Sequence, residues 1–157
     1  MRHLLKSGVL ITLLFLSPSL AAQTLAQTLA QTLAQAGDGT SPGAFELQLN
    51  RLSPSGQGCL MTFVVHNGFS AGLDKSSFEM VIFNGDGLVE RMTVFDFGAL
   101  PAGKTVVRQF EMGNMACEGI GRILVNGAKA CTGEGISPET CIGALKAESK
   151  AGIPFGS

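Results

Sequence analysis

From Phe45 onward the chain is a succession of short runs in which apolar and polar residues alternate. Gly, Asn and Pro residues separate these runs, and no long stretch shows a helical stripe of apolar residues. An alternation with a period of two, rich in β-branched and aromatic residues, is typical of antiparallel strands. We therefore expect a β-sandwich of about six to seven strands. The predicted strands include residues 45–49, 59–65, 78–83, 88–97, 105–112 and 120–125.

The start of the chain has the parts of a secretory signal peptide. Arg2 and Lys6 make it basic, the apolar run 9–16 follows, and small residues lie before a cleavage site after Ala21. The apolar run is far shorter than the ~20 residues that span a bilayer, so we expect a cleaved leader and not a membrane anchor. Residues 1–21 are the predicted signal peptide, and the mature protein is expected to be periplasmic or secreted.

A stretch of low complexity separates the leader from the domain. Residues 23–34 read Gln-Thr-Leu-Ala three times over, and a Gly-containing segment follows. A four-residue period does not stay on one helix face, and short isolated helices are marginal in water. Residues 22–44 are therefore predicted to form a flexible linker. Residues 45–157 have the usual size of a single domain.

Charge and hydropathy exclude two classes of partner. Without the leader the chain keeps nine Lys and Arg residues and twelve Asp and Glu residues, which gives a net charge of −3. Nucleic acids and anionic membranes attract basic surfaces, so neither is an expected partner. No apolar run after the leader is long enough to cross a bilayer, so the mature chain is expected to have no transmembrane span.

Four cysteines follow the leader, at Cys59, Cys117, Cys131 and Cys141. An even number of cysteines in a chain expected to be exported predicts two disulfides. Zinc is not predicted, because the closely spaced ligand pairs of zinc sites are missing and His66 is the only histidine after the leader.

The predicted strand pairing suggests how the cysteines are joined. The strand that starts at Cys59 is expected to pair with residues 105–112, and antiparallel pairing brings the start of one strand beside the end of the other. Cys117 would then lie near Cys59, which leaves the other two cysteines as the second pair. A register shifted by two residues would instead join Cys117 to Cys131 across a hairpin turn at Asn126-Gly127.

The order of strands and turns also resembles a known kind of domain. One strand ends at Asn67-Gly68, and the run 78–83 leads into the turn 84–87. Leu100-Pro101-Ala102-Gly103 then leads into a strand with a central Phe. This layout resembles FxLYD-type domains and other small exported proteins of alphaproteobacterial type. The resemblance implies an all-β, immunoglobulin-like antiparallel β-sandwich. Its motifs are turn and core residues, which imply a fold and no site.

Residues 98–105, Gly-Ala-Leu-Pro-Ala-Gly-Lys-Thr, match the phosphate-binding pattern G-x-x-x-x-G-K-[ST]. In nucleotide-binding proteins a helix follows this loop and points its N-terminus at the phosphate. The residues after Thr105 are Val-Val-Arg-Gln-Phe, whose alternation and β-branching indicate a strand. We therefore expect a turn between strands, and no nucleotide or other cofactor is predicted.

Residues 68–72 match the pattern G-x-S-x-G, with Ser70 at the position of a nucleophile. A nucleophile elbow lies at a strand-to-helix turn of a larger α/β sheet, and its histidine comes later in the chain. Here His66 precedes Ser70, and no helical pattern follows. A loop between strands is expected, so no catalytic residue is predicted.

The turn Asn84-Gly85-Asp86-Gly87 contains oxygen ligands that could suit calcium. It lacks the spaced acids and the final Glu of an EF-hand loop. An Asn-Gly pair between two alternating runs is instead the mark of a hairpin turn, so no metal site is predicted.

The function most consistent with these features is that of an exported, non-enzymatic binding or accessory domain of the cell envelope. Its partner would be an unknown envelope or extracellular protein. Two alternatives stay open: a small secreted hydrolase that uses His66 with Ser70, and an envelope structural protein. An enzyme should show a concave pocket where His66 meets a partner residue. A binding domain should show an exposed apolar patch or a long unpaired edge strand.

Overall fold

The computed structural model describes residues 43–157. The predicted signal peptide, residues 1–21, and nearly all of the predicted linker lie outside the described residues. The described chain contains eight strands and two short helices, which are β1 (Phe45–Ser55), β2 (Gly58–Asn67), β3 (Leu73–Asn84), β4 (Val89–Asp96), β5 (Thr105–Met112), the 3₁₀-helix η1 (Cys117–Gly119), β6 (Ile120–Gly133), α2 (Pro138–Gly143), β7 (Leu145–Ser149) and β8 (Phe155–Gly156).

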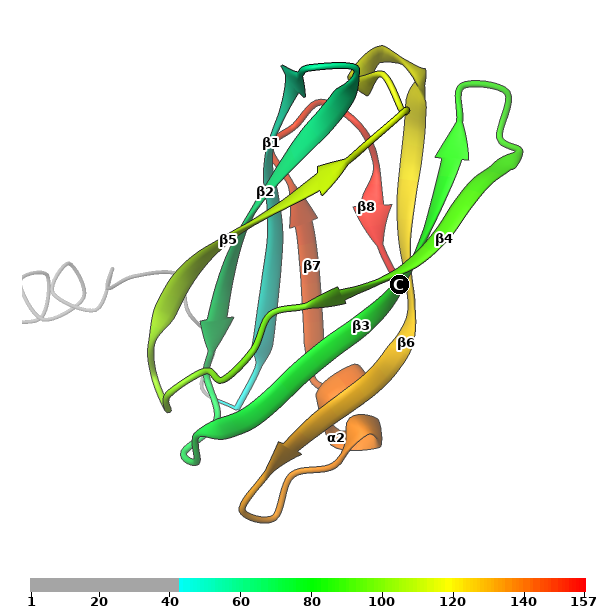
Figure 1. The fold of residues 1–157 in the computed structure, drawn as a ribbon. Coiled ribbons are helices and arrows are strands. Elements are labelled where there is room, and N and C mark those ends of the chain that lie inside the picture. The colour runs from blue at the N-terminus through cyan, green and yellow to red at the C-terminus, as the bar shows by residue number, and fades with distance from the viewer. Residues whose placement is uncertain (1–42) are drawn as a thin grey trace, which may run out of the picture. The chain divides into compact units, whose positions relative to one another are not determined.

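The strands form two four-stranded sheets that pack as a sandwich (Figure 1). One sheet has the order β5-β2-β1-β7 and the other has the order β4-β3-β6-β8. In chain order, β1 to β6 correspond to the immunoglobulin strands A, B, C, C′, E and F. In these letters the first sheet contains the order E-B-A and the second contains the order C′-C-F, which are the orders of the immunoglobulin fold. The predicted immunoglobulin-like sandwich is therefore confirmed.

The last two strands differ from the purely antiparallel arrangement that the sequence predicts. β7 lies parallel to β1, and β8 lies parallel to β6. β7 has five residues and β8 has two, so neither carries a pattern long enough to be recognised from the sequence. The domain therefore has eight strands where six to seven are expected.

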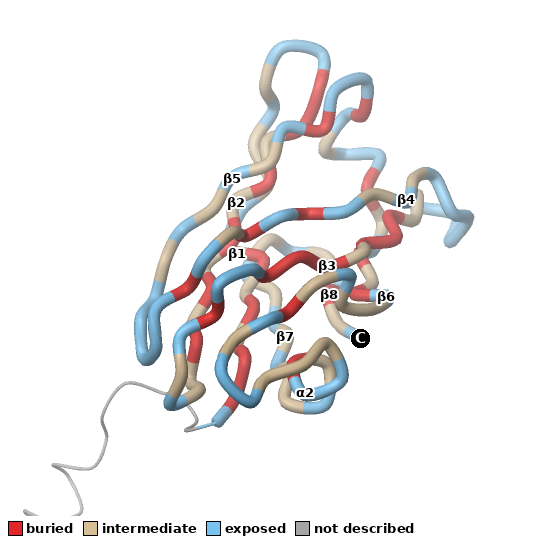
Figure 2. Tube along the Cα trace, turned by 60° about the horizontal axis from the view of Figure 1, so that its bottom comes forward, coloured by how far each residue is buried: buried red, intermediate tan, exposed pale blue. Residues whose placement is uncertain are grey.

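β2 shows the alternation of buried and exposed residues that the sequence predicts for the second strand. Cys59, Met61, Phe63 and Val65 are fully buried between the sheets, whereas the intervening residues are partly exposed (Figure 2). Successive side chains of a strand point to opposite faces, so one face of β2 supplies the core and the other meets solvent. His66 is partly exposed on the solvent side of β2.

Both predicted disulfides are confirmed. Cys59 at the start of β2 is bonded to Cys117 of η1, with Cα atoms 4.9 Å apart. Cys131 near the end of β6 is bonded to Cys141 of α2, with Cα atoms 6.4 Å apart. The first bond follows from the predicted strand pairing, because Cys59 lies opposite Met112 at the end of β5.

The prediction of a strand end and possible hairpin turn at Asn126-Gly127 is wrong. β6 runs without interruption from Ile120 to Gly133 and pairs with β3 along its length. The register shifts beside Asn126, because Gly127 pairs with Glu79 whereas Val125 pairs with Met80. The Asn-Gly pair is therefore accommodated as a β-bulge, which admits one extra residue without reversing the chain.

Candidate functional site

Asn67, the last residue of β2, organises one end of the sandwich. Its side chain is fully buried, and its Nδ2 atom donates hydrogen bonds to the carbonyls of Ala71 at 3.0 Å and Leu100 at 2.9 Å. Its Oδ1 atom accepts a backbone N–H of the β2–β3 loop at 3.1 Å. A buried amide with its hydrogen bonds satisfied holds its surroundings in one arrangement. Asn67 thus links the G-x-S-x-G segment to the segment that matches the phosphate-loop pattern.

The structure does not place Ser70 in the setting that a nucleophile elbow requires. Ser70 is exposed in the loop after β2, and the strand β3 begins at Leu73, where an elbow needs a helix. His66 is partly exposed, and its Nδ1 atom lies 3.0 Å from Oγ1 of Thr105 on β5. In the described part of the chain no hydrogen bond joins His66 to Ser70. The two residues of the alternative hydrolase therefore do not form a nucleophile–base pair here.

The segment that matches the phosphate-loop pattern is a turn that enters a strand, as predicted. β5 begins at Thr105, directly after the pattern. The backbone N–H groups of Gly98, Leu100, Gly103 and Lys104 all donate hydrogen bonds inside the domain, at 2.8 to 3.2 Å. A phosphate-binding loop needs such groups free to face the anion. Positive φ angles of 73° at Gly98 and 65° at Gly103 explain why both turn positions are glycine.

We expect Lys104→Ala to leave the domain nearly unchanged. Lys104 is exposed in this turn, and an exposed position of this kind usually changes the free energy of unfolding by less than ~0.5 kcal/mol. Chemical denaturation of both proteins measures the difference, and isothermal titration with ATP tests for nucleotide binding. Saturable ATP binding that disappears in Lys104→Ala would contradict the interpretation of the pattern as a turn.

The turn between β3 and β4 is the predicted hairpin. The Oδ1 atom of Asn84 accepts the backbone N–H of Asp86 at 3.1 Å and that of Leu88 at 3.0 Å. This oxygen therefore closes the turn, as Asn side chains commonly do. Across residues 43–157, no group of three or more His, Cys, Asp or Glu residues is arranged to hold a metal ion.

A shallow hollow lies between β6 and α2, with a volume of about 180 Å³ and a lining that includes Ala128, Pro138, Glu139 and Ile142. The backbone N–H of Glu139 and the side chain of Ser137 donate to the Glu139 carboxylate and lower its pKa. Pockets that enclose small ligands usually have volumes of ~300–1,000 Å³, so this hollow is small for a ligand site. His66 is not part of its lining.

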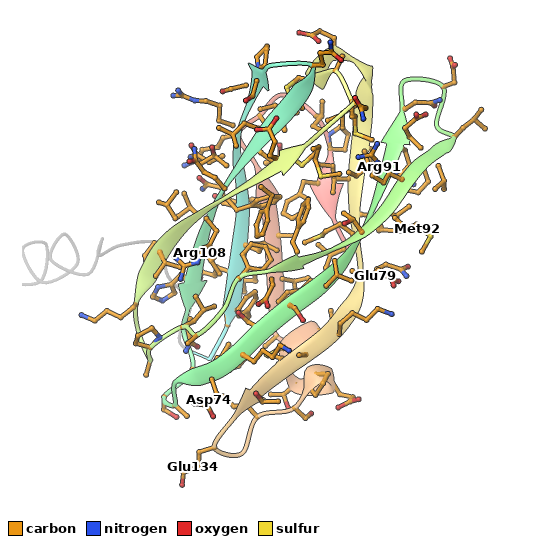
Figure 3. All side chains as sticks on the ribbon, viewed as in Figure 1. Asp74, Glu79, Arg91, Met92, Arg108 and Glu134 are labelled. Atoms are coloured by element: carbon orange, nitrogen blue, oxygen red, sulfur yellow. A yellow bond between two sulfur atoms is a disulfide. The ribbon has the colours of Figure 1, made fainter. Side chains whose placement is uncertain are left out.

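The exposed apolar surface gathers on β4, which is an edge strand. Of the five large apolar side chains that are most exposed in the described chain, four lie on β4 or immediately before it: Leu88, Val89, Met92 and Val94. The β3 residues opposite are Phe83 beside Val89 and Val81 beside Met92. We call these five residues, Val81, Phe83, Val89, Met92 and Val94, the β4 face. Figure 3 labels Met92 on β4 and Glu79 on β3.

Polar interactions border the β4 face. On β3, Glu79 lies opposite Val94, and its carboxylate pairs with the Lys129 ammonium at 2.8 Å. Hydrogen bonds from Lys129 and then from Asn126 lower the pKa of Glu79, so this border stays charged at neutral pH. At the other end the Arg122 guanidinium lies 4.1 Å from the centroid of the Phe83 ring. An apolar centre with a polar rim is the usual organisation of a protein-binding surface.

The sequence contains a signal for the β4 face in the pattern of residues 88–97. Phe95 and Phe97 are buried, and a period of two places Arg91 and Thr93 on the same side as these rings. Met92 and Val94 must then lie on the outer side. The run 88–97 thus has large apolar residues at its outward-facing positions as well as at its inward-facing positions. This is unusual for a strand with one solvent-facing side.

No family model, curated protein or solved structure matches this chain. The resemblance to FxLYD-type domains therefore stays a prediction. Within the described residues, none of the helices is both long and apolar enough to cross a membrane.

Proposed function

We propose that this chain is an exported, non-enzymatic binding domain of the cell envelope, and that it binds another protein through the β4 face. The observation that carries the proposal is the concentration of exposed apolar side chains on an edge strand. β4 carries the charged residues Glu90, Arg91 and Asp96 and a register shift, which commonly limit pairing at an edge, so the exposed apolar side chains and not the strand edge carry the proposal. A contiguous apolar patch with a polar rim marks an interaction site.

The surroundings of Ser70 and His66 support this proposal over the hydrolase alternative, whereas the disulfides support the export that both readings share. The loop that carries Ser70 is anchored by Asn67 and continues into a strand, and His66 contacts Thr105. The two disulfides suit an oxidising compartment, in which an exported domain would work. A small sandwich with fixed loops and an exposed apolar sheet face is suited to recognition of another protein.

Photo-crosslinking from two matched positions tests the proposal. Met92 on β4 and Val107 on β5 are both 57% exposed, and both lie on edge strands. A photoreactive residue is placed at either position, and the protein is irradiated in its own cells. The protein is recovered from the secreted or periplasmic fraction, where its N-terminus is expected at Ala22 or within the repeat of residues 23–34. We expect a discrete protein adduct from position 92 and none from position 107. Equal adduct patterns from both positions, or none from position 92, would refute the β4 face as the binding surface.

A further inference from the structure

We propose that the pair Asn84-Gly85, in the turn between β3 and β4, is a site of spontaneous covalent modification, in which Asn84 is deamidated through a cyclic imide. This inference is independent of the proposed function. Three asparagines after the leader precede a glycine, namely Asn67, Asn84 and Asn126. Glycine has no side chain, so it leaves the backbone nitrogen after the asparagine unshielded. All three pairs therefore share the reactive sequence, and the fold decides which of them reacts.

The reaction uses only the atoms of the pair and water. The backbone nitrogen of Gly85 attacks Cγ of Asn84, so an N–Cγ bond forms and the Cγ–Nδ2 bond breaks. Nδ2 leaves as ammonia and takes up the proton of the Gly85 amide. Water then opens the succinimide ring at one of its two carbonyls, which gives either aspartate or isoaspartate. The net change is the exchange of the amide –NH₂ for –OH, and it requires a backbone that lets the attacking nitrogen turn toward Cγ.

At Asn84 the structure leaves the reacting atoms accessible. β3 ends at Asn84, and Gly85 is exposed in a turn that stands apart from the neighbouring strands (Figure 1). The backbone N–H groups of Asp86 and Leu88 donate to Oδ1 of Asn84 and draw electrons from Cγ, the atom under attack. In the described chain no hydrogen bond holds the Gly85 N–H or Nδ2 of Asn84. Exposed turns also rearrange at a small cost in free energy.

The fold blocks the same reaction at Asn67. Its side chain is fully buried, and Nδ2, which would have to leave, donates to the carbonyls of Ala71 and Leu100. The backbone N–H of Gly68, which would supply the attacking nitrogen, donates to the carbonyl of Ala44 at 2.8 Å. Ring closure would leave these carbonyls without their donors, which is costly inside a protein. Asn67 is therefore expected to react only when the domain unfolds.

Asn126 is exposed, but it lies within a paired strand. β6 pairs with β3 before and after the bulge at Asn126-Gly127. Nδ2 of Asn126 donates to the Glu79 carboxylate, which Lys129 holds by an ion pair at 2.8 Å. Turning the Gly127 nitrogen toward Cγ would disturb the pairing on both sides of the bulge, and paired strands open far less readily than exposed turns. This pair is therefore expected to react more slowly than the pair in the turn.

The products change the turn that leads into the β4 face. Aspartate at position 84 keeps an oxygen that can accept the same two backbone N–H groups. Isoaspartate carries the main chain through its side-chain carbonyl, so the backbone before Leu88 gains a carbon atom and the turn no longer closes in the same way. Either product adds a negative charge to a turn that already contains Asp86.

Peptide mapping of the exported chain during prolonged incubation in neutral buffer, with its disulfides intact, tests this inference. We expect aspartate and isoaspartate to accumulate first at Asn84, while Asn67 stays unchanged. Gly85→Ala should slow the loss of Asn84 several-fold, because a methyl group shields the attacking nitrogen. A Cβ added at Gly85 meets no atom within 4 Å, so the turn is kept. Gly127→Ala is the matched control, because a Cβ added there is equally unhindered, and it should leave the loss of Asn84 unchanged.

The same chain, denatured and with its disulfides reduced, provides the second comparison. There the three pairs should react at similar rates, because the fold no longer distinguishes them. Faster loss of Asn67 or Asn126 than of Asn84 in the folded domain would refute the assignment, as would a loss of Asn84 that Gly85→Ala does not slow. If the denatured chain showed the same order of reaction as the folded domain, the selection of Asn84 by the fold would be refuted.

Discussion

Replacing Phe63 with alanine is expected to lower the free energy of unfolding by about 3–5 kcal/mol. Phe63 is fully buried on β2, and its ring centroid lies 5.6 to 5.9 Å from those of Phe95, Phe97, Phe110 and Phe155. These four rings come from β4, the loop after it, β5 and β8. Removal of the central ring leaves a cavity and ends contacts that join both sheets. Aromatic pairs of this geometry contribute beyond the area they bury.

Chemical denaturation followed by circular dichroism measures this change. A loss of this size is a large fraction of the ~5–15 kcal/mol that stabilises a typical domain. Val107→Ala is the control, because Val107 is exposed on the neighbouring strand and should change stability by less than ~0.5 kcal/mol. If Phe63→Ala changed the free energy of unfolding no more than Val107→Ala does, the ring cluster would not be the centre of the core.

Removal of the Cys59–Cys117 disulfide has the second large expected effect. The bond closes a loop with a sequence separation of 58, and a chain-entropy estimate gives about 4 kcal/mol for a loop of this length. The Cys131–Cys141 bond has a sequence separation of 10 and should contribute about 3 kcal/mol by the same relation. The double variant Cys59→Ala/Cys117→Ala is therefore expected to be the less stable of the two disulfide-free pairs.

Denaturation midpoints of the two double variants, measured side by side, decide this order. Replacing both cysteines of a pair avoids a free thiol, and each variant keeps the other disulfide intact. Intact disulfides are first verified by peptide mapping without reductant. If Cys131→Ala/Cys141→Ala were the less stable variant, the short-loop bond that ties α2 to β6 would contribute more than loop closure explains.

The strands of the core could be recognised from the sequence because their pattern is local. In β2 every second residue from Cys59 to Val65 is buried, so the sequence alone identifies both the strand and its inner face. The pairing of β2 with β5 was expected because it is common in antiparallel sandwiches, and antiparallel geometry then placed Cys117 near Cys59. The phosphate-loop pattern could be interpreted as a turn because the β-branched residues after Thr105 favour a strand.

Other features depend on partners that are distant in the chain. The Asn126-Gly127 pair forms a bulge because the residues after it continue to pair with β3. This pairing is not visible in the local sequence, which only shows a pair of residues typical of turns. The parallel placement of β7 beside β1 joins segments a hundred residues apart. The edge position of β4 was likewise decided by its pairing with β3 on one side.

The sequence by itself thus determined the all-β class and the main strands, because alternation is a property of neighbouring residues, whereas the structure decided between the two cysteine pairings that the sequence left open. Only the tertiary structure decided that β4 is an edge strand whose outer residues Met92 and Val94 stay exposed. It also decided that Asn67 binds together the loops that carry the two chemistry-like patterns. Both outcomes depend on the stacking of two sheets, which brings together side chains that no local pattern connects.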